Sequence, residues 1–495
     1  MRLFNLIAGL IPETMKRALL CLLASILWLG TAARPVKGRV LCDKSPVGDV
    51  LVTDGYSFAR TDAAGNYTLD LDERAHFVSV VTPSGYIAPS DEGFPRFYRA
   101  VEERTSRYDF ELLRWEAPAA GYELLAIADP QPKTEAHFER LSTEIIPVLK
   151  SRCALAAAEA TPQAALILGD IVWDSPQLMA GVKRLFGELG IAIYPVIGNH
   201  DHDRTVNDDD ASAANYRRHF GPTYYAFDLG RTHYIVLDDI VYHGKKRYDE
   251  QLDSLQLDWA SRYARLLPQG SRVCIAMHAP VYKAWIDHTM ESIEPLLAAF
   301  AGFELHFITG HTHINSNYEL RDGVTEHNVA QLCGNLWHDP MNADGTPKGY
   351  QLFREEGDSF AWQYQRLDAR AACAGQSRGP AEPAQRQLKV WLPGQTAANP
   401  DRLVVKAWNW DSYWTVVWYE DGCYKGSMQR TRMADPDYTA RLDSLRGAGV
   451  KLARPQAARP AVFYFTARPS AGTREVTVVA TDRFGRRYTE QVRLR

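Results

Sequence analysis

Four short segments in the middle of the chain carry Asp, Asn and His residues in a pattern that could bind metal ions. They are LILGDIVWD (166–174), IGNHD (197–201), AMHAP (276–280) and ITGHTH (308–313). Three of them follow an apolar run that predicts a buried strand, and strand ends are where an α/β sheet places its chemistry. A single Asp or His at such a position carries little meaning, but the combination indicates a metal site.

The candidate ligands combine carboxylate, amide and imidazole groups, and they are Asp129, Asp170, Asn199, His278, His311 and His313. This set suits two divalent ions of Mn, Fe, Zn or Mg. Successive side chains of the Gly-His-x-His segment point to different neighbours, so its two histidines could each serve a different ion. Asp170 is the natural bridging carboxylate. Two such ions, about 3.5–4 Å apart, clamp a phosphoryl group and hold a hydroxide in line for attack.

The segments that must position these residues alternate between strand and helix patterns from Tyr122 to about Leu367. Strands are expected at 124–128, 164–168 and 192–197, and helices at 137–150, 151–160 and 175–190. This rhythm predicts a largely parallel, sheet-centred α/β domain. A hairpin turning at Gly230-Arg231 adds antiparallel pieces, which favours a sandwich of two sheets.

The two regions that flank this domain are predicted to form β structure. Residues 34–117 show period-two alternation with Gly and Asn turns, which predicts a small antiparallel β-sandwich. Residues 369–387 are small, polar and rich in Pro and Gly, as in a linker. Residues 388–495 alternate again and predict a second β-sandwich, whose aromatic stretch from Trp408 to Tyr419 favours core and inter-domain packing over a sugar-stacking platform.

The metal-site segments resemble the calcineurin-like metallophosphoesterases over Glu123 to Tyr364. The resemblance implies a central α/β/β/α sandwich, here assigned to residues 120–368, flanked by N- and C-terminal β-sandwich domains. By the same resemblance one ion would be held by Asp129, Gln131, Asp170 and His313. The other would be held by Asp170, Asn199, His278 and His311, and His200 would act as the general acid. The N-terminal segment itself resembles the prealbumin-type, carboxypeptidase regulatory-like module.

The chain departs from the family pattern at two positions. The first family block is Asp-x-His, whereas this chain has Asp129-Pro130-Gln131. The glutamine oxygen is neutral and harder than imidazole, which favours manganese, magnesium or iron over zinc at the first ion. Many family phosphatases carry an Asp three residues after the bridging carboxylate to orient the catalytic histidine. Asp174 lies four residues after Asp170 and is the candidate for that role.

The amino terminus is typical of an export signal. Lys16 and Arg17 precede an apolar run over 18–29, and small residues follow over 30–33. Cleavage after Ala33 would release an exported protein, periplasmic or secreted, with no stable membrane insertion, because the run is too short to cross a bilayer. Six cysteines follow Ala33 without a CxxC spacing, so one or two disulfides are allowed but cannot be assigned.

Composition and charge narrow the function classes. The 495 residues need more than one core, and the net charge of −4 without a long run of one sign argues against nucleic acid as the partner. We therefore expect a metal-dependent phosphoesterase acting on a small-molecule or glycan-linked phosphate mono- or diester. The alternative is a catalytically weak, metal-bearing protein that binds a cell-surface glycan or a phosphorylated ligand. An adhesion module alone would leave the central residues unexplained, and the sequence leaves the oligomeric state open.

Overall fold

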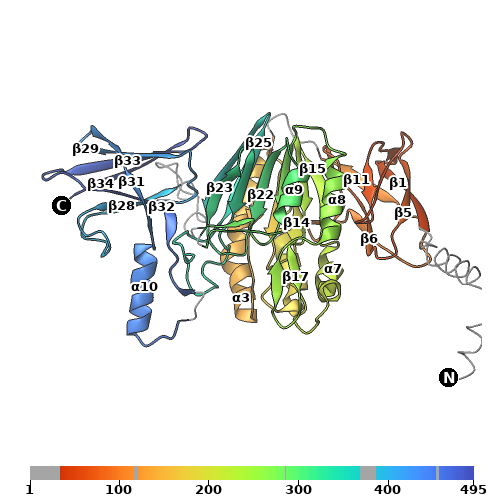
Figure 1. Cartoon of the computed structure of the whole chain (residues 1–495), viewed down its shortest axis with the longest axis horizontal. Coiled ribbons are helices and arrows are strands. Elements are labelled where there is room, and N and C mark those ends of the chain that lie inside the picture. Colours follow the sequence, from red (N-terminus) through yellow and green to blue (C-terminus); the bar gives the residue numbers. More distant parts are fainter. Residues whose placement is uncertain (1–33, 116–120, 285, 368–385, 453–455, 495) are drawn as a thin grey trace, which may run out of the picture.

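The computed structural model describes residues 34–115, 121–284, 286–367, 386–452 and 456–494. The expected export signal (1–33) and the linker, except for its last two residues, lie outside these ranges. Figure 1 shows an N-terminal β domain, a central α/β body and a C-terminal β domain in a row along the long axis. In the described part of the chain, no helix is long and apolar enough to cross a membrane.

The central body is built on two sheets. The first has the strand order β14-β13-β12-β25-β26, in which β12, β13 and β14 are parallel and β25 pairs antiparallel with β12. Its strands are β12 (Tyr122–Ile127), β13 (Gln163–Leu168), β14 (Ala192–Val196), β25 (Gly349–Glu356) and β26 (Ser359–Arg366). The expected parallel strands are therefore present, and a C-terminal hairpin extends their sheet.

The second sheet has the order β15-β16-β19-β22-β24-β23. Its strands are β15 (Tyr225–Leu229), β16 (Thr232–Val236), β19 (Arg272–Ala276), β22 (Glu304–Thr309), β23 (Ser316–Arg321) and β24 (Val324–Asn328). The expected hairpin turning at Gly230-Arg231 joins β15 to β16. Two short hairpins, β17 (Ile240–Tyr242) with β18 (Tyr248–Glu250) and β20 (Tyr282–Lys283) with β21 (His288–Thr289), lie outside the sheet.

Helices cover the outer faces of both sheets. They are α3 (Glu135–Arg140), the π-helical turn η1 (Leu141–Ile145), α4 (Ile146–Ala158), the 3₁₀ turn η2 (Pro176–Leu178), α5 (Met179–Gly187), α6 (Asp209–Ser212), α7 (Ala214–Phe220), α8 (Ser254–Ala264) and α9 (Ile293–Ala299). The two helices expected over 137–150 and 151–160 are instead the continuous run α3-η1-α4. The expected boundary between Lys150 and Ser151 lies inside α4, where no Gly or Pro marks a break.

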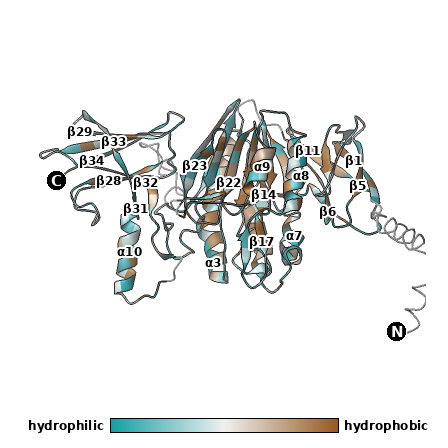
Figure 2. Ribbon diagram, viewed as in Figure 1, coloured by the Kyte–Doolittle hydropathy of each residue, from teal (hydrophilic) through white to brown (hydrophobic). Residues whose placement is uncertain are grey.

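Alternate residues of the central strands fill two different cores. Leu124 and Leu166 point into the space between the sheets, whereas Leu125 and Ile167 pack beneath α4 and α5. In the second sheet, residues such as Ile275 pack against α8 and α9. Burial on both faces explains the nearly continuous apolar runs of these strands, which Figure 2 shows as the brown centre of the molecule. The α/β/β/α arrangement expected from the sequence is confirmed.

The N-terminal domain is a pair of small sheets, with orders β2-β1-β11-β7, to which β5 adds on β1, and β10-β6-β3-β4. Its strands are β1 (Arg34–Cys42), β2 (Ser45–Pro46), β3 (Leu51–Thr53), β4 (Phe58–Arg60), β5 (Asn66–Leu71), β6 (Phe77–Val80), β7 (Tyr86–Ile87), β8 (Ser90–Asp91), β9 (Phe94–Pro95), β10 (Tyr98–Ala100) and β11 (Phe110–Arg114). A backbone bridge between Thr82 and Phe227 joins this domain to β15.

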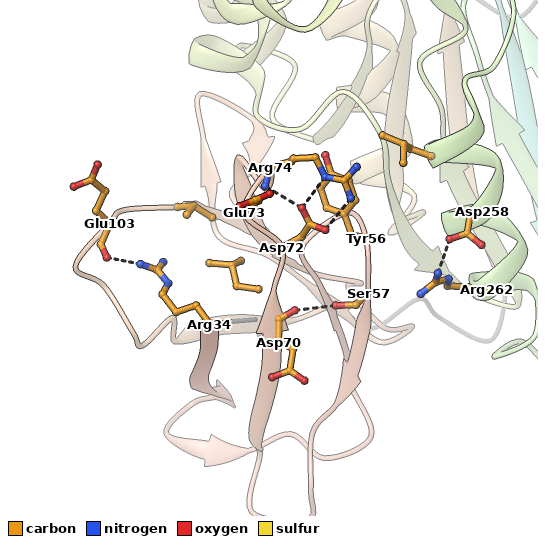
Figure 3. Close-up of a pocket in the computed structure, with 13 residues that line it drawn as sticks. Arg34, Tyr56, Ser57, Asp70, Asp72, Glu73, Arg74, Glu103, Asp258 and Arg262 are labelled. Atoms are coloured by element: carbon orange, nitrogen blue, oxygen red, sulfur yellow. Dashed lines mark hydrogen bonds and ion pairs between the residues drawn. The ribbon is translucent and has the colours of Figure 1, made fainter. Parts of the chain in front are cut away.

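An open pocket lies where the N-terminal domain meets α8 (Figure 3). Its charged side chains are largely paired with their own neighbours: Arg74 binds Asp72, and Arg262 binds Asp258. None of the candidate metal ligands lines it. The candidate metal ligands lie instead at the strand ends of the central body.

The C-terminal domain contains two four-stranded sheets, β27-β28-β32-β31 and β30-β29-β33-β34. Its elements are β27 (Leu388–Trp391), β28 (Leu403–Ala407), β29 (Thr415–Glu420), β30 (Cys423–Ser427), β31 (Gln429–Met433), α10 (Pro436–Gly447), β32 (Ala461–Ala467), β33 (Glu475–Thr481) and β34 (Arg487–Arg493). Trp414 and Trp418 lie in its core, and Trp408 packs on Ala330 and Tyr364 of the central body. The aromatic stretch thus serves packing and domain contact, as expected, whereas α10 was not predicted.

The cysteines of the described residues are all unpaired. Cys42, Cys153, Cys274 and Cys333 are buried and Cys423 is exposed, while Cys373 lies outside the described residues. Cys274 is a fully buried residue of β19, in agreement with the expectation of a small core hydrophobe.

A buried histidine pair joins β22 and β24 near the C-terminal domain. His327 Nδ1 donates to Asn317 Oδ1 over 2.8 Å, and its Nε2 lies 3.0 Å from His306 Nδ1. The Asn317 amide nitrogen donates to Asn409 of the C-terminal domain, so its oxygen must face His327. Burial, followed by the charges of His306 and Arg483, holds the pKa of His327 well below its ordinary value. The structure therefore requires a neutral His327.

This requirement predicts a loss of stability in mild acid. The unfolded chain takes up a proton at His327 near pH 6.5 and the folded chain does not, so the free energy of unfolding falls by up to about 2 kcal/mol from pH 7 to pH 5. His327→Gln, which cannot titrate, should show a smaller drop in melting temperature over this range than the wild type. His288→Gln, at an exposed histidine, is the control, and an unchanged drop in His327→Gln would contradict the assignment.

Candidate metal centre

Five strand ends from the two sheets meet at one edge of the central body and bring the candidate ligands together. Asp129, Asp170 and Asn199 follow β12, β13 and β14 of the first sheet, and His278 and the Gly-His-x-His segment follow β19 and β22 of the second. The candidate ligand atoms form two groups, and within each group all atoms lie within 4.8 Å of one another. The first group is Asp170, His278 and His311, and the second is Asp129, Asp170 and His313. Asp170 is common to both groups, as a bridging ligand requires.

The first of these groups gathers lone pairs around one point. His278 Nδ1 donates to the carbonyl oxygen of Leu168 over 2.8 Å, which leaves Nε2 as the free ligand atom. Its Nε2 lies 3.1 Å from Asn199 Oδ1 and 3.0 Å from His311 Nδ1. His311 Nε2 lies 3.2 Å from Glu250 Oε1, which fixes the other tautomer. Two ring lone pairs and an amide oxygen that face one another are satisfied together by a cation.

The second group contains the unusual ligand. His313 Nε2 lies 3.4 Å from Asp129 Oδ1 and 3.0 Å from the Gln131 amide nitrogen. Among the described residues, Asp129 Oδ1 and Gln131 Oε1 are buried without a hydrogen-bond partner. A half-turn of the Gln131 amide exchanges its oxygen and nitrogen and brings the oxygen beside His313. Orphaned buried acceptors beside an imidazole fit a bound cation.

The electrostatics of the site favour positive charge. Burial disfavours the charged form of Asp170, but the imidazoles of His278 and His200 outweigh it and lower the pKa of Asp170 below its ordinary value. Burial likewise opposes protonation of His278, yet the Asp170 and Asp129 carboxylates raise the pKa of His278 well above its usual range. In the absence of an ion, the Asp170 carboxylate and the His278 imidazole stabilise each other's charged form. A bound divalent ion would take over this stabilisation of the carboxylate.

The backbone at the ligands is held in the left-handed region. Positive φ angles occur at Asp129 (48°), Gln131 (29°), Asp170 (47°), Asp174 (47°), His311 (66°) and His313 (59°). Non-glycine residues rarely adopt this conformation, and its recurrence at strand ends is typical of functional sites. Five of these residues are candidate ligands, and the sixth, Asp174, contacts His200.

Gly169, directly before Asp170, is required by both conformation and space. Its φ is +79°, and a Cβ at this position would lie 2.4 Å from His278 Nδ1. The absence of a side chain therefore lets the loop of the first sheet approach the histidine of the second. This close contact is one of several that join the two halves of the site.

Buried carboxylates behind the ligands hold their loops. Asp201 accepts hydrogen bonds from the backbone nitrogens of Ile171, Val172 and Gly198 at 2.9–3.1 Å. Asp239 accepts from the backbone nitrogens of His278 and Ala279 at 3.0 and 2.8 Å. Asp239 and Glu250 were not among the candidates from the sequence, although Asp239 follows the apolar strand β16 and could have been found by the same strand-end criterion.

Asp174 contacts the candidate acid directly. His200 Nδ1 lies 2.9 Å from Asp174 Oδ1, and Lys246 Nζ lies 2.7 Å from Asp174 Oδ2. Partial burial raises the pKa of Asp174, but the bonds from His200 and Lys246 outweigh this and lower it to about 2. The extra residue in the spacing therefore does not prevent Asp174 from reaching the histidine.

His200 is tied to the metal ligands through its backbone. Its nitrogen donates to Asp170 Oδ1 over 2.9 Å, and the Trp173 ring lies 4.7 Å from its own. Burial lowers the pKa of His200, whereas Asp170 and Asp174 raise it, with a net increase. Its side chain remains 20% exposed, so the ring can meet a ligand at the mouth of the site.

The role of Gly169 gives a test of the site geometry. We expect Gly169→Ala to lower both the melting temperature and the affinity for Mn²⁺, because the new methyl group displaces His278. Gly190→Ala is a matched control, since Gly190 has a φ of +70° and its Cβ would meet nothing within 4 Å among the described residues. The control should cost only the left-handed strain of about 1–2 kcal/mol. Equal Mn²⁺ affinities in the two variants, measured by calorimetry, would contradict the geometry.

Comparisons with solved structures indicate a remote similarity. The chain matches a dimetal phosphatase from Danio rerio at 14% identity, over 50% of this chain and 97% of that one, with a TM-score of 0.37. It matches a 5'-nucleotidase from Candida albicans at 11% identity, over 51% and 53% of the two chains, with a TM-score of 0.36. A purple acid phosphatase from yellow lupin (Lupinus luteus) matches at 10% identity, over 68% and 66%, with a TM-score of 0.37.

Family models place the chain more firmly, although no curated protein matches it. Residues 34–115 match the "N terminal of Calcineurin-like phosphoesterase", residues 123–315 the "Calcineurin-like phosphoesterase" and residues 326–488 the "C terminal of Calcineurin-like phosphoesterase". The third match begins within β24, so it includes the hairpin β25-β26 of the first central sheet. The chain belongs to the calcineurin-like phosphoesterases, a family of metal-dependent phosphoric ester hydrolases, and it carries the N- and C-terminal domains of that family beside the central core.

Proposed function

We propose that this protein is an exported phosphoesterase that hydrolyses a phosphate mono- or diester with two divalent ions. The observation that carries the proposal is the position of Asp170, whose carboxylate belongs to both groups of ligand atoms. One ion would be held by Asp129, Gln131, Asp170 and His313. The other would be held by Asp170, Asn199, His278 and His311. When bound, such ions stabilise charge on phosphoryl oxygens and make water a stronger nucleophile.

Residues around the proposed ion sites hold the ligands in position. Asp201 and Asp239 hold the loops that carry Asp170 and His278, so the ligands keep their positions when a substrate enters. Glu250 fixes the tautomer of His311 and forms an ion pair with Lys283. These contacts keep the free ring nitrogens pointed at one centre, which limits the reorganisation needed during the reaction.

His200 is the proposed general acid. Its Nδ1 is engaged by Asp174, so a proton on Nε2 is available to the leaving-group oxygen. The net increase in its pKa favours the protonated form that an acid needs. Asp174 is a positioning residue in this scheme, and Lys246 balances its charge.

The proposed substrate is a small-molecule or glycan-linked phosphoester met outside the cytoplasm. The export part of the proposal rests on the basic, apolar and small residues over 1–33. The net charge of −4 supports a partner other than nucleic acid. Lys246 and Arg204, both near Asp174, lie on the side of the site that His200 occupies and could meet substrate phosphate oxygens.

The bridging role of Asp170 predicts a loss of both metal binding and hydrolysis. Asp170→Asn keeps the size of the side chain and an acceptor for the His200 nitrogen, but removes the charge that two ions share. We expect it to retain less than one Mn²⁺ per chain and to lose activity on p-nitrophenyl phosphate and bis-p-nitrophenyl phosphate. The chelator-treated wild type should be inactive and recover with Mn²⁺. A fully active Asp170→Asn protein, or a metal-loaded wild type without activity on a panel of phosphate esters, would contradict the proposed function.

The acid role of His200 can be separated from a structural role by the leaving group. Phenyl phosphate needs protonation of its departing oxygen, whereas the p-nitrophenolate ion leaves readily without it. His200→Gln should therefore lower kcat on phenyl phosphate by about 10²- to 10⁴-fold and much less on p-nitrophenyl phosphate. Asp174→Asn should show the same pattern to a smaller degree. A uniform loss on both esters would assign His200 to structure or binding instead.

A further inference from the structure

The C-terminal domain makes a direct contact with the segment that carries two candidate ligands. Arg459, two residues before β32, donates from Nη1 to the carbonyl oxygen of Thr312 over 2.8 Å. Thr312 is buried and stands between His311 and His313. The guanidinium of one domain therefore fixes the backbone of the metal-site loop of another.

A second route runs through the loop over 331–347. On the side of the C-terminal domain, Tyr438 of α10 forms a hydrogen bond with Asn335, and Arg441 forms an ion pair with Asp339. The buried Lys406 of β28 donates to the carbonyl oxygen of Gly345 over 2.6 Å. The C-terminal domain thus contacts this loop through one helix, α10, and one strand, β28.

The same loop contacts the unusual ligand on its other side. Trp337 Nε1 lies 3.2 Å from the carbonyl oxygens of both Pro130 and Gln131. The Gln131 side-chain amide also lies 3.1 Å from the Gln331 side-chain amide. Both routes from the C-terminal domain therefore end at residues of the first ion, namely His313 and Gln131.

The ligands of the second ion are held by the central body. His278 is fixed by Asp239 and by the carbonyl oxygen of Leu168. His311, although next to Thr312, is fixed by Glu250 and by its backbone bond to Asp129. The side chain of His313 instead contacts Asp129 and Gln131, which are themselves proposed ligands of the first ion.

We propose that the C-terminal domain positions the ligands of the first ion, with Arg459 as the principal positioning residue, and leaves the second ion independent of it. The inference rests on the two-ion site of the proposed function. Partners behind a ligand typically contribute 10- to 100-fold to metal affinity. Loss of Arg459 should therefore lower the affinity for one of the two ions by about 10-fold or more, and leave the other unchanged.

Calorimetric titration of the chelator-treated full-length protein with Mn²⁺ tests this selectivity. We expect two ions per chain in the wild type and one tight ion plus one weakened ion in Arg459→Met. Arg446→Met is the matched control, because it removes an exposed arginine of the same domain that pairs with its helical neighbour Asp443. Arg459→Lys retains the charge and one donor and should recover part of the affinity.

A double-mutant comparison identifies which ion is affected. Arg459→Met is combined with Asn199→Ala, which weakens the second ion, and with His313→Ala, which weakens the first. The effect of Arg459→Met should persist beside Asn199→Ala and vanish beside His313→Ala. Electron paramagnetic resonance should correspondingly show a coupled Mn²⁺ pair in the wild type and an isolated Mn²⁺ in Arg459→Met at limiting metal.

The outcomes separate this inference from the proposed function. Equal effects of Arg459→Met in both backgrounds, or an unchanged titration, would overturn the inference. A wild type that binds fewer than two ions would overturn the two-ion site and the inference with it. Two ions, a selective Arg459 effect and no hydrolysis of any phosphate ester would leave the inference standing and contradict the proposed function alone.

Discussion

A buried carboxylate at the junction of two sheets is the constraint on which the rest of this structure depends. Asp170 is 1% exposed, and a buried charge without a partner is strongly destabilising. Its partners come from different sheets, His200 from the first and His278 from the second. The sheets must therefore approach closely at this edge, and Gly169 makes that approach possible. The left-handed backbone at six site residues follows from the same need to turn side chains toward one centre.

The outer carboxylates extend this constraint into the core. Burial, with the charge of Asp170, raises the pKa of Asp201 to about 7, and burial raises the pKa of Asp239 and of Glu326 to about 7 as well. All three accept backbone N–H groups of loops around the site, Glu326 from Val281 and Tyr282. Buried carboxyl groups thus surround, in layers, the position that two cations would fill. Such an arrangement is stable because each layer satisfies donors that would otherwise be buried alone.

The grouping of the candidate ligands could be predicted from the sequence because each follows a strand and is marked locally by its neighbours. Apolar runs that end in Gly-Asp, Gly-Asn-His or Gly-His-x-His place chemistry at a sheet edge without any knowledge of tertiary contacts. Glu250, Trp337 and Arg459 could not be found this way, since they reach the site from a hairpin, a loop and another domain. The helix α10 was not predicted, and the α3-η1-α4 run was predicted as two helices, because packing decides where these helices begin and end.

The position of the unusual ligand gives the C-terminal domain a physical role beyond packing. Gln131 is neutral and binds a cation less strongly than a charged or imidazole ligand would, so its ion gains more from exact placement of the remaining groups. The contacts from Arg459 and from the loop over 331–347 converge on Gln131 and on the residue before His313, whereas His278 is held by the central body. The weak proposed ligand Gln131 and the contacts from the C-terminal domain therefore belong to the same proposed ion site. The second ion, with two histidines fixed inside the central body, does not need that support.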